Sequence, residues 1–481
     1  MNAAPEERSK QMEGSIYEMA MVGLGVMGRN LALNMADKGF AVTGYDVDPQ
    51  KVVALNLEAK ALPARGVDSV GELAAAMRPP RAIMMMVPAG PPVDAVIDAL
   101  LPLMAPHDLL IDGGNSHFRE TEARARRLES KQLLYMGVGI SGGERGARLG
   151  PSIMPGGPEA AYARVRPVFE AIAAKVDSEP CVAYLGPGSA GDYVKMVHNG
   201  IEYALMQVIA ESYDLMKRGL GLGNDELGQV YLNWSTSMLK GYLMEITARI
   251  FAKKDRNSGQ FLLDVILDEA QGKGTGKWTA QDAMDLRVPV PAINEAVAMR
   301  DLSDLRQERR EAHNVLGGPS SLLGEDRQKC IDRLGRALQV STLIIFGQAM
   351  AQLRVASHDY GYGLNLAEVA RIWRGGCIIR SDMLEPIRQA FLKKPDLKNL
   401  LLDPVFSKVV TDNQADLRRV VCLSAEHGMP VPGLGSCLAY LDSYRSAWLP
   451  ANLVQAQRDY FGSHMYRRVD KDGLFHTEWE E

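Results

Sequence analysis

The sequence has few cysteines, and they show no arrangement that would suggest a shared site. Only five occur among 481 residues, and no two have CxxC spacing: Cys181, Cys330, Cys377, Cys422 and Cys437. An odd, dispersed set is typical of reduced thiols in the cytoplasm, and it argues against a disulfide framework or a zinc site. We therefore expect a cytoplasmic protein without a metal site.

Long apolar runs and an excess of positive charge are also missing. No run approaches the roughly 18 apolar residues of a membrane span. The first 14 residues are polar and lack the apolar segment of a secretory leader, so we expect 1–15 to be a disordered extension. A net charge of -5 indicates no nucleic-acid surface. The 46% hydrophobic content is enough for large cores, and the length suggests roughly three domains without membrane or nucleic-acid partners.

A dinucleotide-binding fingerprint stands near the N-terminus. The apolar run 19–22 leads into GLGVMG, followed by a helical pattern over 29–38 and a strand pattern over 40–45 that ends at Asp46. Strand, GxGxxG, helix, strand and acid occur in the order that the fingerprint requires. The first glycine permits the tight turn, the second admits the pyrophosphate, and the third lets helix and strand pack. The predicted cofactor-binding residues are Gly23, Leu24, Gly25, Val26, Met27, Gly28 and Asp46.

Asp46 bears on the choice of cofactor. A carboxylate at this position accepts hydrogen bonds from the ribose hydroxyls of NAD and repels the 2′-phosphate of NADP. Val47 and Asp48 supply no cation, and Lys51 is the nearest candidate. The sequence favours NAD+ and leaves NADP+ open.

Alternation of strands and helices continues to about residue 190. Apolar runs over 82–87, 109–111 and 133–138 are typical of buried parallel strands, and glycine-rich turns at 112–116 and 139–143 follow the last two. Each turn could be an ordinary loop. Ligands of open α/β sheets bind beyond the carboxyl ends of the strands, so two such turns favour a substrate or nicotinamide role. We predict a Rossmann-like domain over 16–190.

The remainder of the chain has few strand patterns. Helical patterns cover 190–220, 225–251, 292–311, 327–360 and 365–373. The residues Gly221, Glu226, Leu227 and Tyr231 are echoed 142 positions later by Gly363, Glu368, Val369 and Trp373. We expect a large all-α, duplicated helical domain over 191–447. An amphipathic segment at 449–464 belongs to a predicted C-terminal tail, 448–481.

Five polar residues share one face of the first of these helices. Their spacing of i, i+3, i+4, i+7 and i+8 aligns Lys195, His198, Asn199, Glu202 and Tyr203. Soluble helices usually reserve that pattern for buried apolar residues. Lysine and glutamate seven residues apart, about 10 Å along the axis, could serve two ends of a small substrate. The alternative is an exposed polar helix with i,i+4 pairs.

A second glycine-rich segment, GKGTGKW at 272–278, has the composition of a phosphate-binding loop. It is not a Walker A motif, because Gln271 stands where the first glycine should be and Trp278 replaces Ser or Thr. Backbone N–H groups, Thr275 and Lys273 could still bind a phosphate. A flexible loop is the alternative.

Taken together, the motifs resemble those of the 6-phosphogluconate dehydrogenase family over about 17–479. The resemblance is carried by GLGVMGRNLALNMADKGF, DGGNS, SGGERGARLGPSIMPGG, KMVHNGIEY, GKGTGKWT, WRGGCIIRS and LPANLVQAQRDYFGSH. It implies oxidative decarboxylation of 6-phospho-D-gluconate to D-ribulose 5-phosphate and CO₂ with reduction of NAD(P)+, in the pentose phosphate pathway and gluconate utilisation. The alternatives are another β-hydroxyacid dehydrogenase acting on a phosphorylated sugar acid, and a non-catalytic cofactor-binding or structural protein.

The resemblance also implies residue roles. Lys195 matches the family's general base and Glu202 its general acid. The residues that match the family's contacts to the substrate carboxylate and hydroxyls are Asn115, Ser141, Gly142, Gly143, His198 and Asn199. Phosphate contacts match Tyr203, Lys273, Thr275 and Arg300. Arg458 and His464 match tail residues that enter a neighbouring subunit's site, which implies a homodimer, possibly a dimer of dimers. Val87, Ala89 and Asn115 match further cofactor contacts.

Two departures from the family pattern concern the cofactor. Members that use NADP usually carry Asn-Arg-Thr where this chain has Asp46, Val47 and Asp48, so the arginine that would bind the 2′-phosphate is missing. Pro88 stands where a lysine is common. Both departures favour NAD+, and neither changes the catalytic residues.

Overall fold

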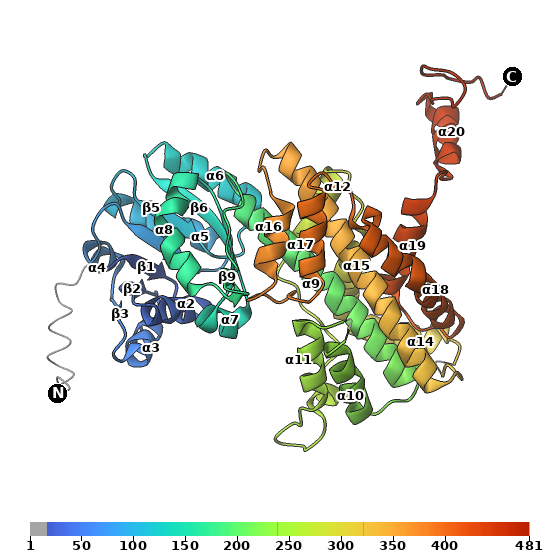
Figure 1. Ribbon diagram of the computed structural model, residues 1–481, viewed down its shortest axis with the longest axis horizontal. Helices are drawn as coiled ribbons and strands as arrows, with labels where there is room; N and C mark the ends of the chain where they lie inside the picture. The colour runs from blue at the N-terminus through green and yellow to red at the C-terminus, as the bar shows by residue number, and fades with distance from the viewer. Residues whose placement is uncertain (1–16, 238, 321, 481) are drawn as a thin grey trace.

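The structure, a computed structural model, describes residues 17–237, 239–320 and 322–480. A sheet domain is followed by a helical domain, and the last helix, α20 (Ala451–Gly462), extends away from both in the view of Figure 1. This arrangement confirms the predicted Rossmann-like domain with a large all-helical domain behind it. The expected extension 1–15 lies outside the described residues.

The sheet of the first domain has seven strands in the order β3-β2-β1-β4-β5-β6-β7. All neighbours are parallel except β6 and β7. The strands are β1 (Met19–Val22), β2 (Val42–Tyr45), β3 (Ala64–Gly66), β4 (Ala82–Met85), β5 (Leu109–Asp112), β6 (Leu134–Ser141) and β7 (Ser152–Gly156). A separate hairpin pairs β8 (Lys175–Val176) with β9 (Glu179–Pro180).

Helices cover both faces of this sheet. Met19 and Met21 of β1 join a core with α2, α3 and α8, while Ala20 and Val22 join a second core with α4, α5 and α6. Alternate residues of a strand point to opposite faces, so the uninterrupted apolar run of β1 fits a strand buried on both sides. The helices are α2 (Val26–Asp37), α3 (Pro49–Ala59), α4 (Val70–Ala75), α5 (Pro91–Leu100), α6 (Phe118–Glu129), α7 (Gly143–Leu149) and α8 (Glu159–Ile172), with a 3₁₀ turn at Leu101–Leu103.

Several strand predictions need correction. β6 extends beyond the predicted run 133–138 to Ser141, because residues 137–141 pair with β7. The strand β4 is shorter than the predicted 82–87. β3, β7, β8 and β9 were not predicted at all. β7 contains Pro155, which a sequence pattern counts against a strand and which an edge strand tolerates.

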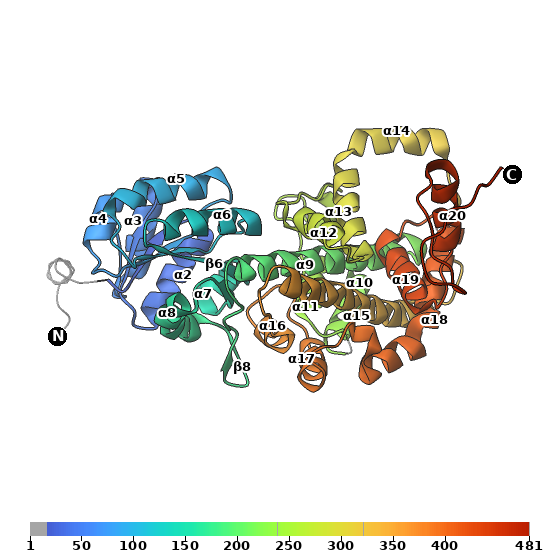
Figure 2. The ribbon, with the colours of Figure 1, turned by 90° about the horizontal axis from the view of Figure 1, so that it is seen from above.

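The second domain is built on two long helices that pack against each other, α9 (Ala190–Asp214) and α15 (Arg327–Asp359) (Figure 2). A π-helical turn at Leu215–Gly219 follows α9. The other helices are α10 (Asn224–Ser235), α11 (Tyr242–Phe251), α12 (Thr275–Asp285), α13 (Pro291–Asp304), α14 (Arg306–Leu316), α16 (Leu366–Trp373), α17 (Leu384–Lys393), α18 (Pro404–Glu426) and α19 (Pro432–Arg445), with 3₁₀ turns at Leu262–Val265 and Leu400–Leu402.

The same succession occurs twice in this domain. A long helix is followed by two shorter ones in α9, α10 and α11, and again in α15, α16 and α17. Gly221 lies in the turn before α10 and Gly363 in the turn before α16, and both have left-handed backbone, at φ +67° and +64°. Gly241 before α11 bridges Ser381 before α17. The sequence echo therefore corresponds to a repeated helical unit.

Two predicted helices are each divided in the structure. The pattern over 225–251 covers two helices, nearly all of α10 and the whole of α11, with Gly241 directly before the second. The pattern over 292–311 is interrupted at Leu305, where ψ is 40° and the backbone leaves the helical region. Helical periodicity continues through both breaks, so sequence alone did not reveal them.

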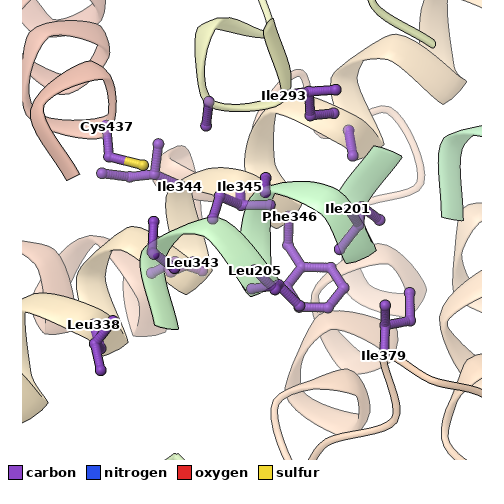
Figure 3. Packing of buried hydrophobic residues seen from close by; sticks show 14 of the residues in the cluster. Ile201, Leu205, Ile293, Leu338, Leu343, Ile344, Ile345, Phe346, Ile379 and Cys437 are labelled. Carbon is purple, nitrogen blue, oxygen red and sulfur yellow. The ribbon is translucent and has the colours of Figure 1, made fainter. Parts of the chain in front are cut away.

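The core of the helical domain lies between α9, α13 and α15. In Figure 3, Ile201 and Leu205 of α9 lie beside Phe346 of α15, and all three are buried. Such contacts on the apolar face of α9 fix the position of the helix that carries the polar stripe. Among the described residues, no helix is both long and apolar enough to cross a membrane.

Candidate active site

The dinucleotide fingerprint forms one wall of a cleft in the sheet domain. The cleft has a volume of about 650 Å³ and is lined by the glycine turn, the start of α2, Tyr45 to Val47 and the segment after β4. A Cβ on Gly28 would collide with the carbonyl of Gly23, whereas one on Gly25 would meet nothing within 4 Å. Gly28 therefore serves helix packing, and Gly25 leaves open space beside the α2 N-terminus where a pyrophosphate fits.

Asp46 lies at the end of this cleft, with its carboxylate held in place. It accepts hydrogen bonds from the backbone N–H of Leu24 at 2.7 Å, from that of Asp48 at 2.9 Å, and from Lys51 Nζ at 3.3 Å. A carboxylate has about four acceptor positions, so one remains for a ribose hydroxyl. Val47 is 84% exposed beside it. The predicted residues Leu24 and Ala89 do not line the cleft, and the amide of Leu24 binds Asp46 instead.

The N-terminal turn of α9 is fixed to the sheet. A side chain on Gly191 would collide with the backbone of β6 and β7 at Gly137 and Met154. On the next turn, Lys195 lies against Gly139, where a Cβ would meet its aliphatic stem. The absence of side chains at these positions lets the helix approach the sheet and brings Lys195 to the carboxyl end of β6.

Three of the predicted substrate residues form one hydrogen-bonded group with the predicted general base, Lys195. Lys195 Nζ donates to Asn199 Oδ1 at 2.9 Å, and His198 Nδ1 lies 3.1 Å from the same oxygen. His198 Nε2 is 3.2 Å from Ser141 Oγ. Because Asn199 Oδ1 can only accept, Nδ1 carries the proton and Nε2 accepts from the serine hydroxyl. Burial, reinforced by the Lys195 charge, holds the pKa of His198 well below its ordinary value, so the imidazole is neutral.

Burial also shifts the pKa values of the two predicted catalytic groups. It lowers the pKa of Lys195, against the opposing effects of Glu202 and Cys377. It raises the pKa of Glu202, although Lys195 and Arg300 act in the opposite direction. Shifts of these signs allow the amine of Lys195 to be neutral and the carboxyl of Glu202 to be protonated at pH values closer to 7.

The far end of the stripe is rich in cationic and N–H groups. The Tyr203 hydroxyl accepts a hydrogen bond from the backbone N–H of Lys273 at 3.2 Å, and the Arg300 guanidinium lies 3.3 Å from the centre of the Tyr203 ring. Thr275 is the first residue of α12, whose N-terminal N–H groups face outward from the helix. Gly276 lets α12 approach Tyr203 closely. The structure thus brings Tyr203, Lys273, Thr275 and Arg300 together, and they can hold an anion.

The two glycine-rich turns lie beside the helix. Ser116 donates to the Asp112 carboxylate at 2.6 Å, which shapes the turn that leaves Asn115 exposed. Gly142 has φ +118°, a Cβ there would collide with the carbonyl of Gly376, and Gly143 begins α7. The turn formed by Ser141, Gly142 and Gly143 therefore lies where the end of β6 meets the helical domain.

The predicted tail residues do not belong to this group within one chain. Arg458 lies on α20 and His464 just beyond it, on the segment that extends away from the helical domain in Figure 1.

The end of α16 and the loop after it contribute residues that the sequence did not mark as functional. Trp373 lies edge-on to His198 with ring centres 5.7 Å apart, and Gly376 accepts a hydrogen bond from Ser152 N at 2.8 Å. Cys377 is buried near Lys195. The motif WRGGCIIRS marked this segment for the resemblance, but nothing in its residue types indicated that it covers the lysine.

Comparison with known proteins agrees with this architecture. Residues 18–186 match the NAD binding domain of 6-phosphogluconate dehydrogenase, and residues 191–479 match the C-terminal domain of 6-phosphogluconate dehydrogenase. The chain is 49% identical to the NADP(+)-dependent, decarboxylating 6-phosphogluconate dehydrogenase of Bacillus subtilis (strain 168), over 97% of this chain and 99% of that protein. It is 47% identical to the decarboxylating enzyme of Escherichia coli (strain K12), with the same coverage.

A solved structure is similar over nearly the whole length. The Plasmodium falciparum 6-phosphogluconate dehydrogenase, described in apo form and in complex with NADP+ and with its substrate 6-phosphogluconate, superposes with a TM-score of 0.93. It is 41% identical, and the match covers 96% of this chain and 100% of that one. With two domain models matching in sequence order and relatives similar from end to end, this chain belongs to the decarboxylating 6-phosphogluconate dehydrogenase family.

Proposed function

We propose that this chain catalyses the oxidative decarboxylation of 6-phospho-D-gluconate to D-ribulose 5-phosphate and CO₂ with reduction of NAD(P)+. The observation that carries the proposal is the buried face of α9. It presents a lysine with a lowered pKa and a glutamate with a raised pKa, between a dinucleotide cleft and an anion-binding end. A seven-residue helical interval, about 10 Å, matches the carbon chain of a phosphorylated sugar acid.

Lys195 acts first as a general base. Its neutral amine takes the proton of the C3 hydroxyl as hydride leaves C3, and the resulting 3-keto acid loses CO₂. The same group, now an ammonium, stabilises the developing enolate. Nicotinamide, when bound, supplies the hydride acceptor. A positioned base contributes roughly 10²- to 10⁴-fold to the rate.

Glu202 acts as the general acid that protonates C1 of the enediol. His198 stays neutral and, with Asn199 and Ser141, offers donors and acceptors to the substrate's carboxylate and hydroxyls. A neutral imidazole suits this place, because a second cation beside Lys195 would oppose the later protonation of the lysine. Asn115, Gly142 and Gly143 line the same end, and Lys273, Thr275, Tyr203 and Arg300 hold the phosphate.

For the cofactor, we propose a preference for NAD+ within NAD(P)+ dependence. The names of the B. subtilis and P. falciparum proteins carry NADP and do not support this preference. The support comes from the chain's own residues: a held carboxylate at Asp46, a second one at Asp48, and exposed Val47 where a cation would be needed. Lys51 is the cation nearest Asp46.

The proposal includes a homodimer in which Arg458 and His464 of one subunit complete the phosphate end of the other. In one chain α20 extends away from the rest, and its residues Leu453 and Phe461 are 61% and 72% exposed. A cytoplasmic location is part of the same proposal, supported by five cysteines that are all free.

The test is release of CO₂ from 6-phosphogluconate labelled at C1, measured in parallel with NAD+ and NADP+. We expect release that is stoichiometric with reduced cofactor. Reduction of cofactor without release of label would mean that 6-phosphogluconate is oxidised without decarboxylation, and neither signal with either cofactor would refute the proposed function.

A further inference from the structure

The C-terminal tail contains a buried carboxylate in an otherwise exposed segment. The side chain of Asp459 on α20 is 0% exposed, whereas its neighbours Tyr460 and Phe461 are 55% and 72% exposed. A carboxylate is costly to bury unless its oxygens are paired, so its surroundings must supply donors.

Those donors come from the part of the chain that follows α20. Oδ1 accepts from Met465 N at 2.9 Å and lies 3.0 Å from His476 Nδ1. Oδ2 accepts from Thr477 N at 3.1 Å and from Trp479 Nε1 at 3.0 Å. Burial acts to raise the pKa of Asp459, but these four donors outweigh it and lower the pKa to about 2. With two donors on each oxygen, the roughly four acceptor positions of the carboxylate are filled, and it holds residues 463–479 against α20.

This fold fixes the backbone on both sides of His464. Ser463 and Met465 both have left-handed backbone, at φ +48° and +56°, a conformation that non-glycine residues keep only when their surroundings impose it. The N–H of Met465 is held by Asp459, and the carbonyls of His464 and Met465 accept from Gln455 Nε2. His464 therefore lies at the apex of a turn between two constrained residues.

We propose that Asp459 is a positioning residue for the proposed reaction: it preforms the tail so that His464, with neighbouring Arg458, meets the substrate phosphate in another subunit as a rigid surface. This inference rests on the proposed function of the tail. Asp459 itself touches no substrate. Because Asp459 orders the loop before the substrate binds, the entropy cost of ordering that loop does not reduce the binding free energy.

The perturbation that isolates this role is Asp459→Asn, which keeps the shape but replaces an acceptor oxygen by an N–H₂ group facing donors. The matched control is Asp470→Asn, a tail carboxylate whose only side-chain partner in the described structure is exposed Arg468. We expect KM for 6-phosphogluconate to rise roughly tenfold with Asp459→Asn, the effect of one weakened charge-assisted contact. The kcat, the KM for the cofactor, the melting temperature and the oligomeric state should change little. A KM within twofold of the wild type would overturn the inference.

A milder variant covers the possibility that Asp459→Asn does not fold. Trp479→Phe removes one of the four donors and should raise the same KM by a smaller factor. If it leaves KM unchanged in a folded protein, the inference fails.

A truncation before Arg458 separates this inference from the tail's proposed role. If truncation raises KM and Asp459→Asn does not, the tail acts without this carboxylate and only the inference fails. If neither raises KM, the proposed role of the tail fails first.

A mixed dimer tests the direction of the effect. One subunit carries Asp459→Asn with Lys195 intact, and the other carries Lys195→Met with an intact tail. The single competent site then receives the intact tail, so we expect wild-type KM. A raised KM in the mixed dimer would refute action on another subunit.

Discussion

Replacement of both Asp46 and Val47 is the most direct test of how this chain selects its cofactor. The double variant Asp46→Asn, Val47→Arg removes one negative charge at the end of the cleft and adds a cation at a position that is 84% exposed. Asparagine can still accept the 2.7 Å hydrogen bond from Leu24 N, so the glycine turn should keep its shape. We expect the preference to move from NAD+ towards NADP+.

The magnitude follows from the local charges. Asp46 and Lys51 line this end of the cleft, and Asp48 lies beside them at 4.0 Å from Lys51 Nζ, which leaves one negative charge in excess. Two unit charges about 4 Å apart interact with roughly 4 kcal/mol at an effective dielectric constant of about 20. Halving this for an open cleft leaves about 2 kcal/mol of repulsion, or roughly thirtyfold, and an added arginine contact brings the total shift to about 10²- to 10³-fold.

The assay is the ratio of kcat/KM for NAD+ to that for NADP+ at saturating 6-phosphogluconate. Asp98→Asn is the control, because this carboxylate belongs to the same domain, is 59% exposed and does not line the cleft. Its ratio should match the wild type. A wild-type ratio that already favours NADP+ would refute the reasoning, and it would mean that Lys51 outweighs both carboxylates.

Three further predictions concern the α9 site and the core behind it. Lys195→Met should keep the fold and dinucleotide binding but lower kcat by roughly 10²- to 10⁴-fold or more, and near-normal turnover would remove the lysine from the base role. Glu202 must carry a proton to act as an acid, so activity should fall as pH rises through its raised pKa; Glu202→Gln should lower kcat and abolish that alkaline limb, and a limb that persists belongs to another group. Phe346→Ala removes a fully buried ring beside Ile201 and Leu205 and should cost about 3–5 kcal/mol of unfolding free energy, and a loss below 1 kcal/mol in denaturant titration would mean that the cavity collapses.

Local patterns were sufficient for some of these features. The glycine turn needs only neighbouring residues to form, and the polar stripe needs only helical periodicity, so Gly28, Lys195 and Glu202 could be identified from the sequence. The resemblance then supplied the substrate. The role of each residue remains a prediction that the assays above address.

Other features depend on partners distant in the chain. β7 forms because residues 152–156 meet the end of β6, and its sequence, which includes Pro155, does not indicate a strand. The neutral state of His198 depends on burial, which periodicity cannot measure, and its tautomer depends on a contact with Ser141, 57 positions earlier. The break at Leu305 has no proline or glycine to mark it.

The course of α9 has a consequence for how this enzyme can change. Lys195 and Glu202 stand on one uninterrupted helix whose first turn is fixed to the sheet at Gly191 and whose middle packs on α12 at Gly200. One inserted residue between them would turn Glu202 by about 100° away from the lysine, and an insertion of a whole turn, about four residues, would restore the face but move the two groups about 6 Å further apart. The seven-residue interval therefore fixes the distance between the two groups. Point substitutions along it can change which acid is accepted, but small insertions or deletions in this stretch would abolish the arrangement.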